Sequence, residues 1–297
     1  MWRGVFFKTL LELNLRCKNG RSLYTMLKQP EPEDCLLELG RGIERVAPIV
    51  FLMPGELDER TLSMVVGKHK VLGETFGLGV VLFGQAAEYV GPVVHTLSLA
   101  ANRGFGTNDS AGRRGNAALR AVRFVNSQSE LCDVPSGEDE LDFSTMRAEV
   151  MKVLPLPFSP IALEFVEPLQ LEGSKKSGRR ILQPQDLTAA RLAETLLRRV
   201  SNLSACHSGV ALDLDGLNPM LQGLHFTHTD LNLCKQEQFS ANRTRQAKND
   251  RDNLSGIIGT VHIELNHHQW LWPYFQLAPF LGLGKRASYG QGAMRVG

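Results

Sequence analysis

The sequence lacks any apolar run long enough to cross a lipid bilayer. The apolar stretch at residues 75–87 is short and interrupted by glycines, whereas a membrane helix needs about 20 consecutive apolar residues. The first ten residues resemble a signal peptide at first sight. Lys8 and Glu12 interrupt their apolar run, and no small-residue cleavage site follows. We therefore expect neither a membrane protein nor a secreted one.

The chain is also poor in cysteine and in recognisable metal ligands. Its five cysteines are scattered and form no CxxC pair, which argues against a disulfide framework or a zinc ribbon and favours reduced thiols in a cytoplasm-like compartment. His225 and His228 lie three residues apart on a predicted strand, so their side chains point to opposite faces. We expect no metal site and no cofactor.

Strong net charge is absent too. The 297 residues carry a net charge of +2, and 43% hydrophobic and 22% charged residues are typical of a globular protein. Affinity for a polyanion must therefore come from local clusters of basic residues. The length suffices for two domains with separate cores.

What the sequence does contain is two halves with the same order of elements. Each half has a helix, an apolar strand, a second helix, a glycine-rich loop and a final strand, which an internal duplication of a β-α-β-β-α-β unit explains best. The first copy lacks its opening strand. Periodicity predicts helices at 3–16, 85–102, 184–203 and 270–281, and strands at 46–52, 73–83, 117–125, 159–166, 224–233, 257–265 and 293–296. We expect an α+β protein.

A stretch of different composition separates the halves. Residues 126–147 contain Ser, Gly, Pro, Gln and six acidic residues, a composition typical of linkers. We place an N-terminal domain at 1–125, an acidic linker at 126–148 and a C-terminal domain at 149–297.

The last glycine-rich loop, residues 282–292 (GLGKRASYGQG), is the leading candidate for a binding site. It is not a nucleotide-binding P-loop, because Pro279 stands where that motif needs glycine and the segment follows a helix. Two interpretations remain open: a loop that cradles a phosphate backbone, or a sharp turn from a helix into an edge strand.

Basic residues gather in further loops. Each cluster alone is compatible with an ordinary solvated face, but together they favour a basic groove. The clusters are Lys175, Lys176, Arg179 and Arg180; Arg243, Arg245, Lys248 and Arg251; and Arg113, Arg114, Arg120 and Arg123.

Several motifs, in this order along the chain, resemble those of the CRISPR-associated RAMP superfamily. The closing loop is similar to its C-terminal glycine-rich motif, and more narrowly to that of the endoribonuclease that processes CRISPR repeat RNA. The other matching segments are Trp2-Arg-Gly-Val-Phe, Gly73-Glu-Thr-Phe, Val81-Leu-Phe-Gly-Gln-Ala86, Asn102-Arg-Gly-Phe-Gly106, Arg199-Val-Ser-Asn-Leu203, Asn242-Arg-Thr-Arg-Gln246 and Gly256-Ile-Ile-Gly-Thr260.

The resemblance implies tandem ferredoxin-like (RNA-recognition-motif-like) domains and metal-independent cleavage of the CRISPR precursor within its repeat. In that reaction the 2′-hydroxyl attacks the adjacent phosphodiester, and the protein keeps the 3′ hairpin. It implies a prokaryotic cytoplasmic protein, CRISPR repeat RNA as the partner, other CRISPR effector subunits as further partners, and no small-molecule substrate. We expect RNA contacts from Arg16, Lys175, Lys176, Arg179, Arg180, Arg243, Arg245, Gln246, Lys248, Lys285, Arg286, Ser288 and Tyr289.

The chain departs from the family pattern at the catalytic position. Relatives often carry a histidine on or just after the first helix, but this chain has Lys8 there, and its first histidine is His69. A lysine is no base near pH 7 unless burial or nearby cations lower its pKa. Three possibilities follow: Lys8 acts with Arg3 or Arg16 on the phosphorane, His69 supplies the base, or cleavage is slow or lost. In the last case the protein is a non-catalytic subunit that binds an RNA hairpin.

Overall fold

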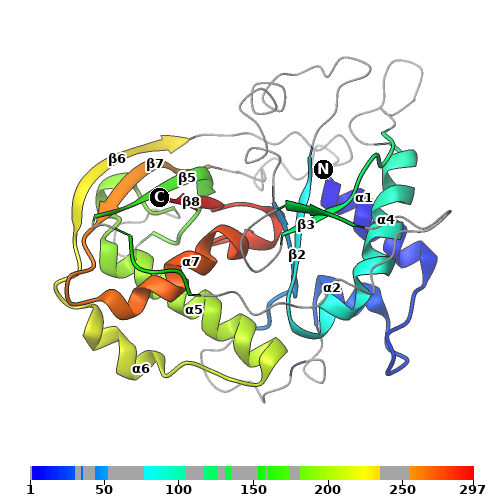
Figure 1. Ribbon diagram of the computed structural model, residues 1–297, viewed down its shortest axis with the longest axis horizontal. Helices are drawn as coiled ribbons and strands as arrows, with labels where there is room; N and C mark the ends of the chain where they lie inside the picture. The colour runs from blue at the N-terminus through cyan, green and yellow to red at the C-terminus, as the bar shows by residue number, and fades with distance from the viewer. Residues whose placement is uncertain are drawn as a thin grey trace, which may run out of the picture.

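The computed structural model describes residues 2–30, 35, 44–52, 77–104, 117–125, 131–134, 153–157, 160–173, 181–234 and 255–297. They form a mixed α/β protein, with the C-terminal half at the left of Figure 1 and the N-terminal half at the right. No helix within these ranges is long and apolar enough to cross a membrane.

The C-terminal half is built around a four-stranded antiparallel sheet with strand order β6-β7-β5-β8. Along the chain the elements alternate as β-α-β-β-α-β, the ferredoxin-like topology that the sequence predicts for this half. They are β5 (Ile161–Leu169), α5 (Ala189–Ser208), β6 (Phe226–Cys234), β7 (Gly256–Ile263), α7 (Trp272–Leu281) and β8 (Met294–Val296); the short α6 (Leu214–Leu217) precedes β6.

Helix α5 begins later than the sequence suggests. Pro184 was the expected start, but Pro184–Asp186 forms a separate 3-10 turn, η5. The helix starts after Thr188, whose hydroxyl accepts a hydrogen bond from the backbone N–H of Arg191 at 3.2 Å and so satisfies a free amide of the first turn. It ends at Gly209, which takes the left-handed conformation with φ 71°.

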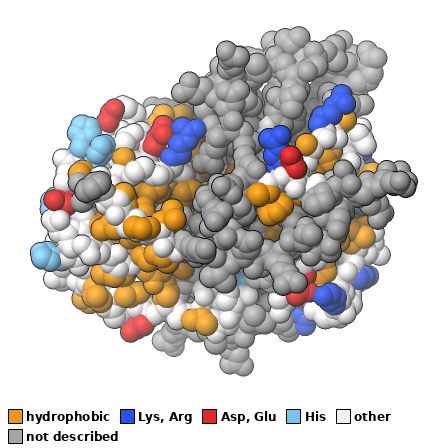
Figure 2. All heavy atoms as spheres, in the orientation of Figure 1, with side chains coloured by type: hydrophobic (Ala, Val, Ile, Leu, Met, Phe, Trp, Pro, Cys, Tyr) orange, Lys and Arg blue, Asp and Glu red, His pale blue; other side chains and the backbone are white. Residues whose placement is uncertain are grey.

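The two faces of the C-terminal sheet differ in character. Alternate residues of β5 and β7, such as Leu163 and Val261, are buried against α5 and α7. The residues between them, including Glu164 and His262, point to the opposite, outer face. Figure 2 shows histidine side chains gathered at the upper left of the molecule, over β6 and β7.

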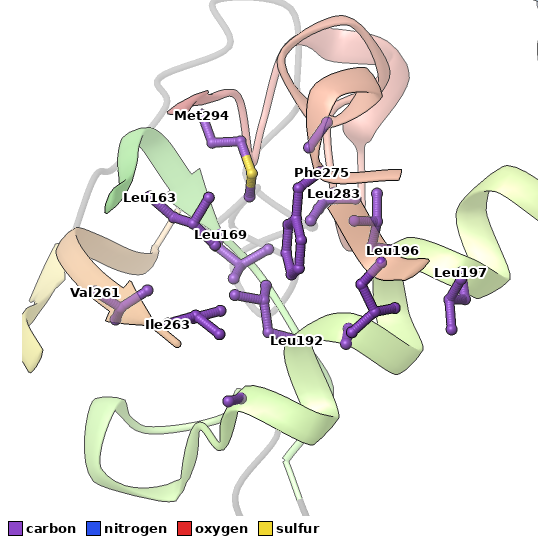
Figure 3. Close-up of a cluster of buried hydrophobic side chains, with 14 of the residues drawn as sticks. Leu163, Leu169, Leu192, Leu196, Leu197, Val261, Ile263, Phe275, Leu283 and Met294 are labelled. Atoms are coloured by element: carbon purple, nitrogen blue, oxygen red, sulfur yellow. The ribbon is translucent and has the colours of Figure 1, made fainter. Parts of the chain in front are cut away.

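The core between sheet and helices is closely packed (Figure 3). Phe275 of α7 lies between leucines of α5 and of β5, and Met294 closes the core from β8. Burial of these side chains supplies the main stabilising term, about 1.5–3 kcal/mol for each large apolar side chain. The strands and helices that carry the closing loop are therefore firmly held.

The N-terminal half has its own core. Helices α1 (Trp2–Leu13), α2 (Leu23–Lys28) and α4 (Val90–Asn102) pack with the antiparallel pair β1 (Ile49–Leu52) and β2 (Gly79–Leu82), and the 3-10 turn η3 (Gly84–Tyr89) leads into α4. The rings of Phe6 and Phe51 meet edge to face, with centroids 5.2 Å apart.

A second small sheet pairs β3 (Arg123–Val125) with β4 (Leu131–Asp133). The strand expected at 117–125 is therefore much shorter than predicted, and β4 falls within the predicted acidic linker. Within the described ranges the two N-terminal strand pairs are separate sheets. The second ferredoxin-like unit stays a prediction.

The two halves meet along the C-terminal end of α5. The backbone N–H of Glu44 donates to Asn202 Oδ1 at 3.4 Å, and His207 Nε2 lies 2.8 Å from the carbonyl oxygen of Val46. Gly84 approaches so closely that a Cβ there would lie 2.4 Å from the carbonyl oxygen of His207. Strand β1 also contacts η9 (Ala287–Tyr289) in the closing glycine-rich loop.

Candidate nucleic-acid interface at the glycine-rich loop

The loop between α7 and β8 is fastened to the end of β5 by backbone hydrogen bonds. The N–H of Lys285 donates to the carbonyl of Gln170 at 2.8 Å, and the N–H of Gly292 donates to that of Pro168 at 3.1 Å. The loop also closes on itself, since the N–H of Leu283 donates to the carbonyl of Gly292 at 3.1 Å. Its backbone is therefore fixed before any ligand arrives.

Two of the glycines have a packing role. A Cβ at Gly292 would lie 2.1 Å from the carbonyl oxygen of Leu283, and one at Gly284 would lie 2.4 Å from that of Gln170. Both residues also have positive φ, 65° and 74°, which only glycine adopts without cost. These contacts support the interpretation of the loop as a tight turn. If the loop also binds phosphate, it does so through its side chains and its outer surface.

The side chains of the loop provide positive charge at its surface. Lys285 is exposed, and its ammonium lies 2.9 Å from Glu172 Oε1. Because 53% and 69% of these two side chains are accessible, the ion pair is weak and readily exchanged for a phosphate. Arg286 and Ser288 are half-buried. The backbone of Arg286 has a positive φ of 61°, although Arg286 is not a glycine.

The catalytic candidates of the first helix lie in the other half. Lys8 is exposed on α1, whereas its neighbours Phe6 and Phe7 are buried in the N-terminal core. The guanidinium of Arg3 lies over the ring of Phe7, 5.1 Å from its centroid, a cation–π contact that holds the arginine in place. The structure thus leaves the side chain of Lys8 open to solvent.

Arg16 follows α1 in an isolated bridge to Ser22. It is exposed, and its Nη1 lies 3.5 Å from the carbonyl of Gly20. Arg103, from the Asn-Arg-Gly-Phe-Gly motif at the end of α4, pairs with Glu12 of α1 and donates to Thr9 Oγ1 at 3.3 Å. That motif arginine ties α4 to α1.

The C-terminal half decides the family. Residues 163–294 match the family model of the CRISPR-associated endoribonuclease Cas6. Residues 163–294 therefore form a domain of the Cas6 family. Cas6 is a family of CRISPR-associated endoribonucleases that bind RNA and act in CRISPR RNA processing, and the resemblance drawn from the sequence motifs is confirmed. Residues 1–146 match a second model, described as an N-terminal domain.

Solved Cas6 structures share the fold. A Cas6 product complex of Thermus thermophilus is 16% identical, with a TM-score of 0.52 over 99% of this chain and 90% of that one. A partial Cas6-RT-Cas1–Cas2 complex is 15% identical, with a TM-score of 0.51 over 93% of this chain and 41% of that one. No curated protein is matched.

Beside the loop of this Cas6 protein lie two charged residues that spacing alone did not select. Arg199 of α5 donates from Nη2 to the carbonyl of Leu281, the last residue of α7, at 3.3 Å. Burial lowers the pKa of its guanidinium to about 10, so it remains charged near pH 7 and compensates the helix dipole directly before the loop. Its place in the Arg-Val-Ser-Asn-Leu motif was the available sequence signal.

The second is Glu167, which lies where the register of β5 against β7 shifts. Its N–H donates to the carbonyl of Ala293 at 3.3 Å, and burial raises the pKa of its carboxyl to about 7. A glutamate in an apolar strand sequence (IALEFVEPL) was the signal for it. Such a carboxyl exchanges a proton near neutral pH at the edge of the loop.

The remaining predicted residues lie outside the described ranges. They are His69, Lys175, Lys176, Arg179, Arg180, Arg243, Arg245, Gln246 and Lys248. Of Tyr289 the structure describes the backbone, which belongs to η9. The described residues thus place Lys285, Arg286 and Ser288 in one loop, and Arg3, Lys8 and Arg16 on or just after α1.

Proposed function

We propose that this Cas6 protein cuts CRISPR precursor transcripts within the repeat, without a metal ion, and stays bound to the 3′ hairpin of the guide RNA. The observation that carries the proposal is the closing loop, whose backbone is anchored on β5 while Lys285 is exposed at its surface. A preorganised loop with exposed positive charge suits a phosphate backbone, because little freedom is lost when the ligand binds.

The proposed chemistry is an internal transfer. The 2′-hydroxyl attacks its own phosphodiester, the bond to the 5′-oxygen breaks, and the products carry a 2′,3′-cyclic phosphate and a 5′-hydroxyl. A base near the 2′-oxygen, an acid near the 5′-oxygen and cations near the phosphorane accelerate it. We assign phosphorane stabilisation to Lys8 and Arg3, and we keep His69 as the alternative base.

The decisive experiment incubates the purified protein with labelled repeat RNA in EDTA. We expect one discrete cut, with a cyclic phosphate on the upstream product. Lys8→Ala and His69→Ala then distinguish the two candidate centres, with Lys28→Ala, an exposed lysine on α2, as the matched control. The catalytic proposal fails if no discrete product forms in EDTA.

A second function has one observation in its favour. Helix α1, Trp2–Leu13, contains no histidine, and its Lys8 is exposed. A non-catalytic subunit that holds the guide hairpin would need the loop but no base. Tight hairpin binding without any cleavage, with or without added divalent ions, would favour this alternative.

The wider organisation is proposed on the same basis. We infer a second, incomplete ferredoxin-like unit at 1–125, a linker at 126–148 and the C-terminal domain at 149–297. Repeat RNA is the proposed partner, together with other CRISPR effector subunits in a prokaryotic cytoplasm. The association of Cas6 with reverse transcriptase, Cas1 and Cas2 in a related structure supports protein partners. Co-purification of this chain with the products of neighbouring genes tests them.

A further inference from the structure

A bulge in β6 places two histidines opposite each other on the outer face of the C-terminal sheet. Phe226 pairs with Ile263 and His228 pairs with His262, so Thr227 is an extra residue in β6. In a regular ladder without the bulge, Thr227 and not His228 would lie opposite His262. Bulges of this kind re-aim side chains and are often found beside functional sites.

The two imidazole rings already lie close to the arrangement in which both bind one metal ion. Their centroids lie 5.4 Å apart, and the ring planes are inclined by 89°. Two imidazoles bound to one tetrahedral zinc ion, with Zn–N bonds of about 2.0–2.1 Å, have centroids about 5 Å apart. His228 is exposed and His262 half-buried, so both rings have room for the small rotation that aims two nitrogens at one point.

The charges around the pair favour a cation. Asp230 and Glu164 both lie opposite Thr260 in the neighbouring row of the same face, and both are exposed. A guanidinium also reaches this row, from Arg295, which pairs with Glu164 at 3.5 Å. The carboxylates beside the two imidazoles attract a metal ion and repel RNA phosphates, so this face is a poorer RNA surface than the closing loop.

We propose that His228 and His262 bind a divalent transition-metal ion of the Zn²⁺, Ni²⁺ or Cu²⁺ class on the outer face of the sheet. Imidazole is a preferred ligand for these ions. Within the described ranges no three His, Cys, Asp or Glu side chains are grouped to hold a metal. The pair therefore supplies two ligands and water completes the shell, which predicts a modest affinity.

The proposed ion would cross-link β6 and β7 through one histidine of each strand. The pair lies at the end of the two strands that is remote from their long connection, residues 235–255. Pairing two strands that are joined by a long connection costs a substantial loss of chain entropy. A metal ion that binds the paired strands but not the unfolded chain stabilises the folded state against that cost. The ion takes no part in the proposed cleavage, which is tested separately in EDTA.

The test uses the untagged full chain, freed of metal by EDTA and dialysed into a buffer that does not chelate. ZnCl₂ and NiCl₂ alone are titrated by calorimetry into the wild type, His228→Ala, His262→Ala and the control His225→Ala. His225 is an exposed histidine just before β6 and lies outside the pair. Circular dichroism checks that each variant keeps its fold.

We expect each pair variant to weaken binding of one ion per chain at least tenfold and His225→Ala to leave it within twofold. MgCl₂ should not bind, since Mg²⁺ prefers oxygen ligands. Zn²⁺ should also raise the thermal midpoint of the wild type and not that of the pair variants. The proposal is overturned if no ion binds at millimolar concentration, if both pair variants bind like wild type, or if Mg²⁺ binds as tightly as Zn²⁺.

Discussion

His207, near the end of α5, reaches across to the N-terminal half and lies 2.8 Å from the carbonyl oxygen of Val46. The imidazole is buried, with 8% of the residue accessible, and Gly84 packs directly on its backbone. A buried polar contact of this kind is specific, because a missing partner leaves the carbonyl without its hydrogen bond.

We predict that His207→Ala lowers the free energy of unfolding by about 1–3 kcal/mol, the cost of leaving a buried polar group unsatisfied. Urea unfolding monitored by circular dichroism measures it. His225→Ala, on an exposed histidine, should change stability by no more than about 0.5 kcal/mol. Equal effects of the two substitutions would contradict the role assigned to His207.

Gly292 should be the most sensitive glycine of the closing loop. In Gly292→Ala the residue keeps φ 65°, which costs about 1–2 kcal/mol for an L-residue, and its Cβ meets the carbonyl of Leu283. Gly20→Ala is the matched control, because φ is 80° there and no atom lies within 4 Å of the added Cβ. Gly292→Ala should therefore destabilise the protein more than Gly20→Ala and weaken RNA binding, whereas a larger loss in the control would refute the packing argument.

The charges of the closing loop should control RNA affinity. Lys285→Ala combined with Arg286→Gly should weaken hairpin binding and reduce its salt dependence, because fewer phosphate contacts release fewer counterions. Glycine is chosen at 286 because it tolerates φ 61°, so a loss of affinity cannot be attributed to a strained loop. Unchanged affinity in filter binding at two salt concentrations would remove this loop from the RNA interface.

Glu172→Gln should have the opposite effect. Glu172 pairs with Lys285 at 2.9 Å, and its carboxylate competes with phosphate for that ammonium. Its removal should tighten hairpin binding a few-fold at low salt, with Glu88→Gln, which frees the distant Lys18, as the control. A weaker complex would show that Glu172 serves to orient Lys285.

Glu167 should make stability depend on pH. Burial raises its pKa from 4.5 to about 7 in the folded protein, so between these values the folded state binds more protons than the unfolded chain. The contribution of Glu167 to the free energy of unfolding is fully present below about pH 4.5 and is lost as the pH rises through about 7. Glu167→Gln should then stabilise the protein at pH 8 by about 1–3 kcal/mol and have little effect at pH 4.5. Glu164→Gln, on the exposed face of the same strand, is the control, and pH-dependent urea midpoints are the measurement.

Local patterns predicted the C-terminal half well and the N-terminal half less well. The alternation at 224–233 and the apolar run at 257–265 correspond to β6 and β7, since burial of one sheet face sets a period of two. The start of α5 predicted at Pro184 was wrong, because the side chain of Thr188, four residues later, caps the helix. The pairing of β3 with β4 lies in a segment whose acidic composition favoured a linker, and composition does not report strand partners.

The histidines show a further limit of sequence spacing. Two residues lie between His225 and His228, and regular alternation along one strand would place their side chains on opposite faces, but the bulge at Thr227 interrupts that alternation. The pairing of His228 with His262 depends on the bulge at Thr227 and on a register between strands joined by residues 235–255. Register across such a connection is a tertiary property.

The contact between β1 and η9 has a consequence for cooperativity. The N-terminal half covers one side of the closing loop through β1, and Ala287 of η9 is buried, with 4% of the residue accessible. A fragment that begins at residue 149 would lack β1, expose that side of the loop and leave the loop held only by contacts within the C-terminal half. The two halves should accordingly melt in a single transition, and the loop should owe its shape to residues more than two hundred positions away in the chain.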